Sequence, residues 1–230
     1  MTNPFAELLN LNNVSHGFRE AGAWRGVLRG VNLRIHSGEQ LALVGQSGSG
    51  KSTLMHLIGG LDVPLSGEIY FENTDLAAMG EPARTLWRRQ KVGFIYQFFN
   101  LIPTLTVLEN VLLPLELNGT PASIGRQAGL NLLDEVGLVD RAETYPDRLS
   151  GGEQQRVAII RALIHQPRLV LADEPTGNLD AATGEQVLDL LDRLVRAKGH
   201  TLILVTHSAE VARRADRIVR LVDGQLALEA

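Results

Sequence analysis

Leu41-Ala42-Leu43-Val44 runs directly into Gly45-Gln46-Ser47-Gly48-Ser49-Gly50-Lys51-Ser52-Thr53, and this stretch decides the fold. The four apolar residues are typical of a buried strand, and the apolar residues after Thr53 have helical spacing. Glycine removes the Cβ atoms that would keep backbone N–H groups away from phosphate oxygens. Lys51 adds a charge for the outer phosphates, Ser52 offers a hydroxyl to magnesium, and the helix N-terminus faces the same anion. The stretch therefore predicts a nucleoside triphosphate site.

The composition is that of a globular chain of 230 residues, with 44% hydrophobic and 21% charged residues. This length fits one domain with a substantial core. The net charge of −4 gives no general attraction to nucleic acid. The absence of cysteine excludes disulfides, thiol catalysis and cysteine-bound metals. No secretory signal is visible, and no apolar run approaches the ~20 residues that cross a bilayer, so we expect a partner to supply any membrane span.

Two segments before the phosphate loop, 8–14 and 27–35, are rich in Val, Leu and Ile and are predicted to be strands of an antiparallel edge. The glycines between them predict a loop, and Phe18 falls in it. An aromatic ring there could stack on adenine or could be a simple hydrophobic anchor, and the residues alone leave both open.

Polar groups follow four predicted buried strands, which begin at Leu41, Val92, Leu169 and Leu202. Because open α/β sheets bind ligands at the carboxyl ends of their strands, we expect these groups to converge on one nucleotide. Asp173 at such an end can hold magnesium through its water shell, and Glu174 can orient and deprotonate a water molecule. Gln97 could reach a metal or be a surface residue, and His207 could be catalytic or structural.

Helical periodicity over 104–137 predicts an all-helical insertion. The apolar stretch 98–103 before it is either a docking surface for a partner helix or part of the core. Further on, Leu149-Ser150-Gly151-Gly152-Glu153-Gln154-Gln155-Arg156 opens a helix over 154–165 with a capping serine, which suits a second anion although capped helix starts are common. A helix over 183–196 and a closing hairpin over 218–228 around Asp223-Gly224 complete the prediction.

Taken in chain order, these motifs resemble the ATP-binding cassette ATPases over essentially the whole length. The Leu-Ser-Gly-Gly sequence is the specific part, because it separates these proteins from other phosphate-loop ATPases. The resemblance implies an α/β fold: a phosphate-loop NTPase core with a mostly parallel sheet, an antiparallel β subdomain and an all-helical subdomain near 98–165, together forming one domain over 1–230.

The resemblance also implies a head-to-tail homodimer with two ATP molecules, each between the phosphate loop of one subunit and Ser150-Gly151-Gly152 of the other. Residues 45–53 and Phe18 would bind ATP, and Lys51 would neutralise its β and γ phosphates. Ser52 and Gln97 would coordinate Mg²⁺ with help from Asp173. Glu174 would act as general base, His207 would hold the γ-phosphate, and Asp180 would link the two sites.

Finer details, such as Glu153 in place of the common Gln and the stretch 172–180, look like the lipoprotein-release and macrolide-export ATPases. This subgroup implies separate membrane permease subunits, a peripheral location on the cytoplasmic face of the inner membrane, and no nucleic acid partner. Phe18 departs from the Tyr that commonly stacks on adenine. The alternatives are the ATPase of a solute importer, an ATP-switched scaffold of the cell-division type and a nucleic-acid factor; the last is disfavoured by the single uninterrupted cassette and the negative charge.

Overall fold

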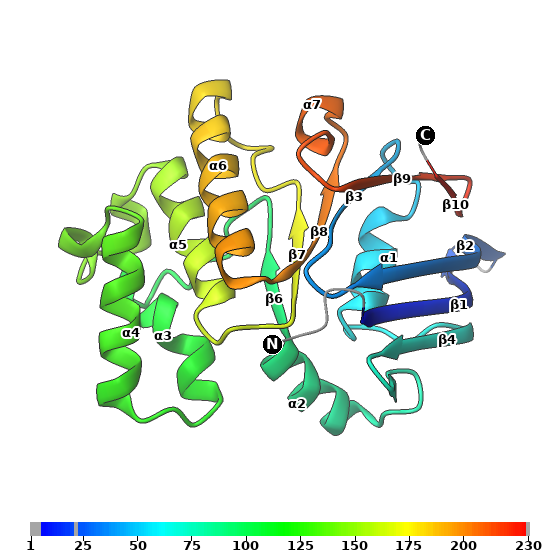
Figure 1. The fold of residues 1–230 in the computed structure, drawn as a ribbon, viewed down its shortest axis with the longest axis horizontal. Coiled ribbons are helices and arrows are strands. Elements are labelled where there is room, and N and C mark those ends of the chain that lie inside the picture. The colour runs from blue at the N-terminus through cyan, green and yellow to red at the C-terminus, as the bar shows by residue number, and fades with distance from the viewer. Residues whose placement is uncertain (1–5, 21–22, 229–230) are drawn as a thin grey trace. The chain divides into compact units, whose positions relative to one another are not determined.

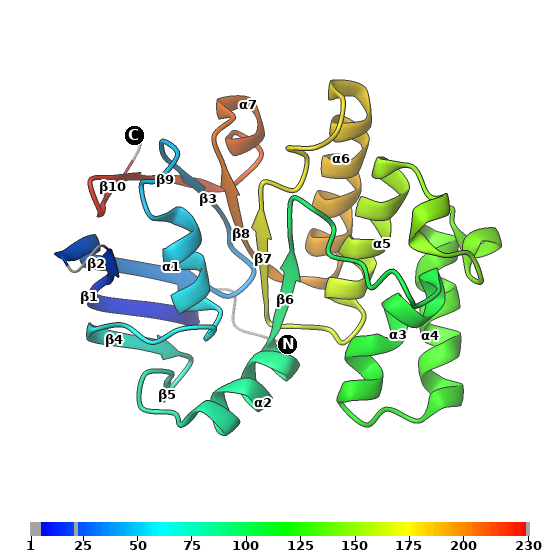
Figure 2. The ribbon, with the colours of Figure 1, turned by 180° about the vertical axis from the view of Figure 1, so that it is seen from behind.

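The computed structural model describes residues 6–20 and 23–228, which form two compact units. The first contains the described residues up to Arg88 and from Thr201 onward, and the second is Arg89–His200. Figures 1 and 2 show the ribbon from two opposite sides. The expected single domain over 1–230, with its helical subdomain near 98–165, stays a prediction.

An antiparallel sheet forms one layer of the first unit, as the Val- and Leu-rich segments predicted. Its strand order is β2-β1-β4-β5. The bounds are β1 Glu7–Glu20, β2 Ala23–His36, β4 Ser66–Phe71 and β5 Thr74–Asp75. Inward residues such as Leu9 and Ile35 lie opposite each other and are completely buried. The two long strands extend well beyond the predicted segments, because the region predicted as a loop continues the β1–β2 ladder up to Glu20 and Ala23.

A second layer of the first unit carries the phosphate loop. In it β3 (Gln40–Val44) pairs in parallel with β8 (Thr201–Thr206) and β9 (Arg217–Val222), and β9 pairs antiparallel with β10 (Gln225–Leu228). Every residue of β3 and β8 is buried, which is typical of parallel strands covered on both faces. The β9–β10 hairpin confirms the predicted closing hairpin, and its turn residues Asp223 and Gly224 both have positive φ. The helices that begin in this unit are α1 Lys51–Ile58, α2 Glu81–Lys91 and α7 Ala209–Ala212.

The second unit combines two parallel strands with a group of helices (Figure 2). Its strands are β6 Val92–Ile95 and β7 Leu169–Asp173. Its helices are α3 Val107–Leu117, α4 Ala122–Glu135, α5 Gly151–Leu163 and α6 Ala181–Lys198, with 3-10 turns at Val139–Arg141 and Pro146–Arg148. Helix α3 packs against α4 and α5, and α5 packs against α6 and β6. The helical periodicity over 104–137 is thus confirmed.

Close packing of α5 on β6 depends on Gly93. A Cβ atom at this position would overlap the carbonyl oxygen of Ala162 in α5. The helix that begins at the Ser150 turn is therefore seated directly on the strand that leads to Gln97.

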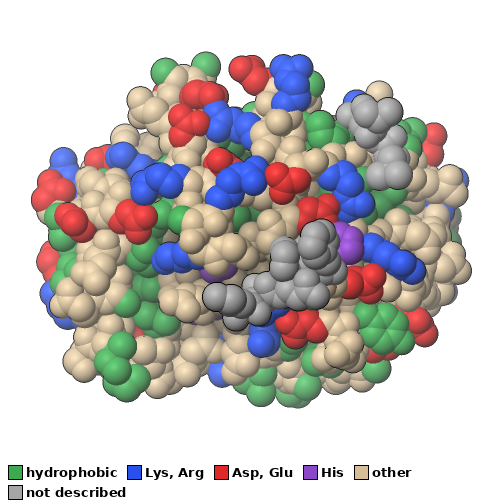
Figure 3. Space-filling view, in the orientation of Figure 1, with side chains coloured by type: hydrophobic (Ala, Val, Ile, Leu, Met, Phe, Trp, Pro, Cys, Tyr) green, Lys and Arg blue, Asp and Glu red, His purple; other side chains and the backbone are tan. Residues whose placement is uncertain are grey.

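The surface carries charged side chains of both signs, interspersed on the face drawn in Figure 3. Among the described residues, no helix is both long and apolar enough to cross a membrane.

Candidate functional site

The phosphate loop leaves the buried strand β3 at Val44 and returns to helix α1 at Lys51. Inside the loop, the Lys51 ammonium donates to the carbonyl oxygens of Gly45 (2.8 Å) and Gln46 (2.9 Å). Lys51 therefore bridges the two ends of the loop and holds its ammonium group against the loop backbone. An ammonium held this way is placed to exchange loop carbonyls for phosphate oxygens.

Glycine is required at two loop positions by the backbone itself. Gly48 has φ 76° and Gly50, the N-cap of α1, has φ 104°. A Cβ atom at Gly50 would also come within 2.8 Å of a Val27 methyl group, whereas Gly48 has open space around it. These conformations turn successive N–H groups toward one side, as an anion-binding loop needs.

A hollow of about 860 Å³ borders the first half of the loop. Its lining comes from the loop, from β2 and from the β9–β10 turn, and includes Trp24, Arg29, Ser47, Gly48 and Arg220. Trp24 is 54% exposed and was not singled out from the sequence. No sequence pattern points to it.

Phe18 is not in a loop, contrary to the prediction, because it lies within β1 opposite Arg25 of β2. The glycines that suggested a loop instead allow close strand pairing, since a Cβ atom at Gly17 would overlap the carbonyl oxygen of Arg25. The Phe18 ring is 48% exposed and stands edge-on to His16 at 5.0 Å. The role of Phe18 in stacking on adenine stays a prediction.

His207 and the phosphate loop emerge side by side. Strands β3 and β8 run parallel with Val44 opposite Thr206, so Gly45 and His207 are the next residues on neighbouring strands. Two of the four strand ends therefore lie next to each other within the first unit. His207 is exposed, and the following Ser208 caps the short helix α7.

In the second unit the same relationship places Gln97 and the two acids near each other. Ile95 of β6 lies opposite Ala172 of β7, so Gln97 follows the end of one strand, while Asp173 is the last residue of the other and Glu174 follows it. Glu174 has φ 46°, a left-handed conformation that costs a non-glycine residue free energy and is concentrated at functional sites. The convergence of all four strand ends on one nucleotide stays a prediction.

A pair of amide hydrogen bonds joins these two strand ends. Gln97 Nε2 donates to Asn178 Oδ1 and Asn178 Nδ2 donates to the Gln97 carbonyl oxygen, both at 3.0 Å. Asn178 was not a predicted site residue, because nothing in the sequence links it to Gln97, 81 positions away.

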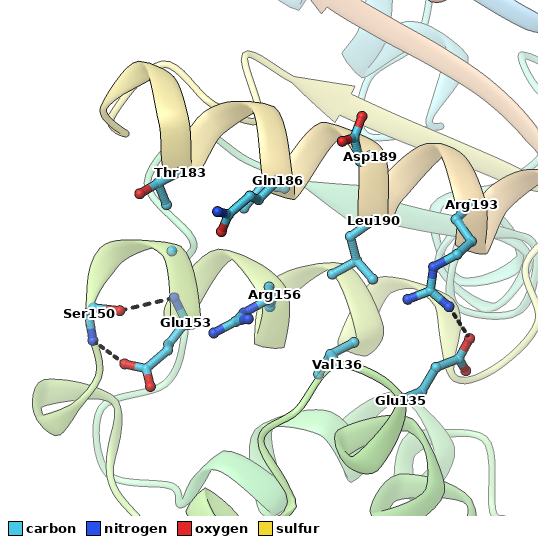
Figure 4. Close-up of a pocket in the computed structure, with 12 residues that line it drawn as sticks. Glu135, Val136, Ser150, Glu153, Arg156, Thr183, Gln186, Asp189, Leu190 and Arg193 are labelled. Carbon is cyan, nitrogen blue, oxygen red and sulfur yellow. Dashed lines mark hydrogen bonds and ion pairs between the residues drawn. The ribbon is translucent and has the colours of Figure 1, made fainter.

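The Ser150 turn caps α5 by a reciprocal pair of bonds, drawn in Figure 4. The Ser150 hydroxyl accepts from Glu153 N (3.3 Å) and the Glu153 carboxylate accepts from Ser150 N (2.7 Å). Because the N-cap is Ser150, the helix begins at Gly151, three residues earlier than predicted. The hydrogen bond from the Ser150 N–H to the carboxylate lowers the pKa of Glu153. The glycines allow close packing at this helix start, since a Cβ atom at Gly152 would come within 2.5 Å of the Thr183 methyl group and one at Gly151 within 3.3 Å of Leu179.

A pocket of about 590 Å³ extends from this turn between α5 and α6. Thr183, Gln186, Leu190 and Arg156 project into it in Figure 4, and an ion pair between Arg193 and Glu135 (3.1 Å) lies at its far end. Asp180 caps α6 near the same end as Thr183, since its carboxylate accepts from Thr183 N at 3.0 Å. Hydrogen bonds from Thr183 lower the pKa of Asp180.

The apolar stretch predicted as docking surface or core is a loop with Phe98 72% exposed. Phe99 and Asn100 both have positive φ, and Arg161 of α5 donates to both carbonyl oxygens (2.8 and 2.7 Å). Asn110, completely buried, bonds the backbone of Ile102, Leu105 and Thr106. The loop is therefore held in one shape while it presents an aromatic ring to solvent. Arg161 and Asn110 were not predicted, because their partners are backbone atoms.

Comparison with known proteins gives consistent matches. The family model for the ABC transporter matches residues 28–177. The ABC transporter ATP-binding protein Rv0986 of Mycobacterium tuberculosis (strain H37Rv) is 52% identical over 95% of this chain and 88% of its own. The lipoprotein-releasing system ATP-binding protein LolD of Geobacter metallireducens is 46% identical over 96% of this chain and 98% of its own.

Solved structures match over nearly the whole chain. The dimeric, post-hydrolysis ATP-binding cassette MJ0796 bound to ADP and Pi has a TM-score of 0.87 and 41% identity, over 97% of each chain. A further dimeric structure of that bacterial ABC transporter cassette has the same TM-score and 42% identity.

Proposed function

Because this chain belongs to the ABC transporter family of ATPases, we propose that it is the ATPase subunit of a membrane complex of the export or lipoprotein-release type. Its family chemistry is the binding of ATP with Mg²⁺ and hydrolysis to ADP and phosphate. The observation that carries the proposal is the likeness, over nearly the full length of both chains, to proteins named for lipoprotein release.

Residues 45–53 are the proposed phosphate site. The Lys51 ammonium donates to two loop carbonyl oxygens in this structure and would bind the β and γ phosphates of ATP. The N–H groups of the loop and of the first turn of α1 would surround these phosphates. Phe18 would stack on the adenine with its exposed face.

Ser52, Gln97 and Asp173 are the proposed magnesium ligands, and their chemistry fits that ion. Mg²⁺ prefers oxygen donors, and the three side chains offer a hydroxyl, an amide oxygen and a carboxylate. The amide nitrogen of Gln97 is already bonded to Asn178, which leaves its oxygen as the end available to a cation. When bound, the ion would supply positive charge to the phosphate oxygens.

Glu174 is the proposed general base, and His207 the residue that holds the γ-phosphate. A carboxylate at the start of the turn after β7 can take a proton from the attacking water, while an imidazole beside the phosphate loop can donate to a γ-phosphate oxygen. The left-handed backbone at Glu174 supports a functional reason for its position.

A head-to-tail homodimer would complete each site. In it Ser150-Gly151-Gly152 of one subunit would contact the nucleotide on the phosphate loop of the other, and Asp180 would link the two sites. The support is the capped, glycine-lined start of α5 and the dimeric form of the solved relatives.

The membrane subunits would be separate permease chains that contact the loop 98–103, whose Phe98 is the exposed anchor. This arrangement would place the chain on the cytoplasmic face of the inner membrane. A solute importer and an ATP-switched scaffold are the alternatives; the scaffold is disfavoured by the intact Glu174 and His207.

The test compares the size and turnover of the purified chain and of Glu174→Gln, with and without Mg-ATP. We expect ATP to convert Glu174→Gln from monomer to dimer while its turnover falls roughly 10²- to 10⁴-fold, the usual contribution of a general base. Unchanged turnover would remove Glu174 from the role of base. A mutant that binds ATP and stays monomeric would contradict self-assembly of the two-subunit site.

A further inference from the structure

Gln97 and Asn178 determine each other's amide orientation. The backbone oxygen of Gln97 can only accept hydrogen bonds, so Asn178 must turn its NH₂ group toward that oxygen at 3.0 Å. Asn178 Oδ1 then faces the side chain of Gln97, which must present its own NH₂ group, also at 3.0 Å. The usual ambiguity of amide orientation is thus resolved by one obligate acceptor.

Gly177 limits the Gln97 side chain from a second direction. A Cβ atom at Gly177 would lie 2.8 Å from Gln97 Nε2, 3.0 Å from Cδ and 3.3 Å from Cγ. The side chain of Gln97 is therefore packed against the backbone of the turn that follows Glu174, with no space for a larger residue between them. Gly177 N also donates to the Glu174 carbonyl oxygen (3.0 Å), which closes this turn.

We propose that Asn178 is a positioning residue that orients the Gln97 amide so that its oxygen, and not its nitrogen, is available to Mg²⁺. The inference rests on the proposed role of Gln97 as a metal ligand. Residues that orient a ligand from behind typically change metal affinity 10- to 100-fold when replaced. Without Asn178 the amide is free to rotate and to present NH₂ groups, which a cation repels.

The experiment measures Mn²⁺, a paramagnetic substitute for Mg²⁺, binding to the ATP-loaded Glu174→Gln protein by electron paramagnetic resonance. In this background we expect Asn178→Leu, which has similar size and no amide, to weaken Mn²⁺ binding about 10-fold. ATP binding in EDTA should be unchanged, because the loss concerns the metal alone. Asn178→Asp still accepts from Gln97 Nε2, and we expect it to lose clearly less affinity than Asn178→Leu.

Gln97→Ala separates failure of the inference from failure of the proposed ligand. If Gln97→Ala leaves Mn²⁺ binding unchanged, the metal role of Gln97 fails. If Gln97→Ala weakens binding and Asn178→Leu does not, only the positioning role fails. Adding Asn178→Leu to Gln97→Ala should cause no further loss, and independent, additive losses would overturn the inference.

Gly177→Ala is a second variant that leaves Asn178 intact. Its Cβ atom would displace the Gln97 amide through Nε2, the atom that bonds Asn178, so we expect weaker Mn²⁺ binding. Mn²⁺ binding equal to that of the parent protein would contradict the tight packing on which the proposed orientation depends. The unfolding midpoint of each variant shows whether the fold is retained.

Discussion

Ser150 and Glu153 cap helix α5 for each other, the hydroxyl accepting from one N–H and the carboxylate from the other. Glu153 stands in place of the Gln that is common in ATP-binding cassettes, one of the details in which the chain resembles the lipoprotein-release and macrolide-export ATPases. The negative charge of Glu153 lies at the positive end of the helix dipole, and the Ser150 N–H lowers its pKa. This carboxylate therefore stabilises the start of the helix that carries the Ser-Gly-Gly turn.

Glu153→Ala is expected to lower the free energy of unfolding by about 1 kcal/mol, the usual contribution of a helix cap. Glu153→Gln should lose less, because its amide oxygen still accepts from Ser150 N. Urea unfolding followed by circular dichroism at neutral pH measures both. Equal losses would mean that the bond to Ser150 contributes nothing beyond the charge.

Ser150→Ala is expected to abolish turnover without weakening ATP binding by the monomer. In the proposed dimer, Ser150 serves the nucleotide bound to the other subunit, so the chain's own phosphate loop is unaffected. ATP binding at low protein concentration and steady-state hydrolysis at high concentration measure the two properties. Loss of ATP binding together with turnover would contradict a site built from two subunits.

Gly125 and Gly129 are one turn apart in α4 and are expected to respond oppositely to alanine. A Cβ atom at Gly125 meets side chains at 3.7 Å or more, whereas at Gly129 it comes within 2.7 Å of Leu112 and 2.9 Å of Leu108. Gly125→Ala should stabilise the helix by roughly 0.5–1 kcal/mol through helix propensity. Gly129→Ala should lose stability, because buried Leu108 must move. If both substitutions stabilise the protein by a similar amount, the α3 side chains move aside at no measurable cost, and the prediction for Gly129→Ala is wrong.

The sequence predicted most of this fold because its strongest signals are local. The run 41–53 determines strand, loop and helix within thirteen neighbouring positions, and the strand of 201–206 and the hairpin at Asp223-Gly224 are equally local. Phe18 was misplaced because Gly17 signals both a loop and a close strand pair, and only the partner strand distinguishes them.

Site residues could be predicted from the sequence where their role depends on residue type within a motif. They could not be predicted where their role depends on contacts between distant parts of the chain. Lys51 and Glu174 are recognised by their chemistry in a motif. Asn178 and Arg161 act on Gln97 and on the carbonyl oxygens of Phe99 and Asn100, and no sequence pattern encodes which backbone atom a side chain will meet.

Acid is expected to destabilise the protein through His165 and His200. Burial is the main cause that lowers the pKa of each imidazole below its ordinary 6.5, although each ring bonds a carbonyl oxygen, Val92 at 3.1 Å and Pro167 at 2.7 Å. The unfolded chain then binds more protons than the folded chain below about pH 6.5. The contribution of these two histidines to the free energy of unfolding is therefore fully present above that pH, and it is lost as the pH falls below it.

His200→Gln should reduce the difference between the unfolding midpoints at pH 7.5 and pH 5.5, because an amide does not titrate and its NH₂ group can still donate to Pro167. Exposed His56 is the control, and His56→Gln should leave the difference unchanged. If His200→Gln shows the same difference between the two unfolding midpoints as the parent protein, His200 does not contribute to the acid sensitivity.

Phe98 offers a direct test of the proposed permease contact, because the chain has no cysteine and Phe98→Cys creates a single labelling site. An environment-sensitive dye there should shift to the blue when inner-membrane vesicles that contain the partner permease are added, since the 72% exposed side chain would become buried. The matched control is Ile124→Cys on α4, which is 62% exposed and lies outside the loop. Its dye should not respond to the same vesicles, and vesicles that lack the permease should affect neither dye. Equal shifts at both positions would indicate non-specific adsorption and contradict docking through loop 98–103, the loop that Arg161 and Asn110 hold in one shape.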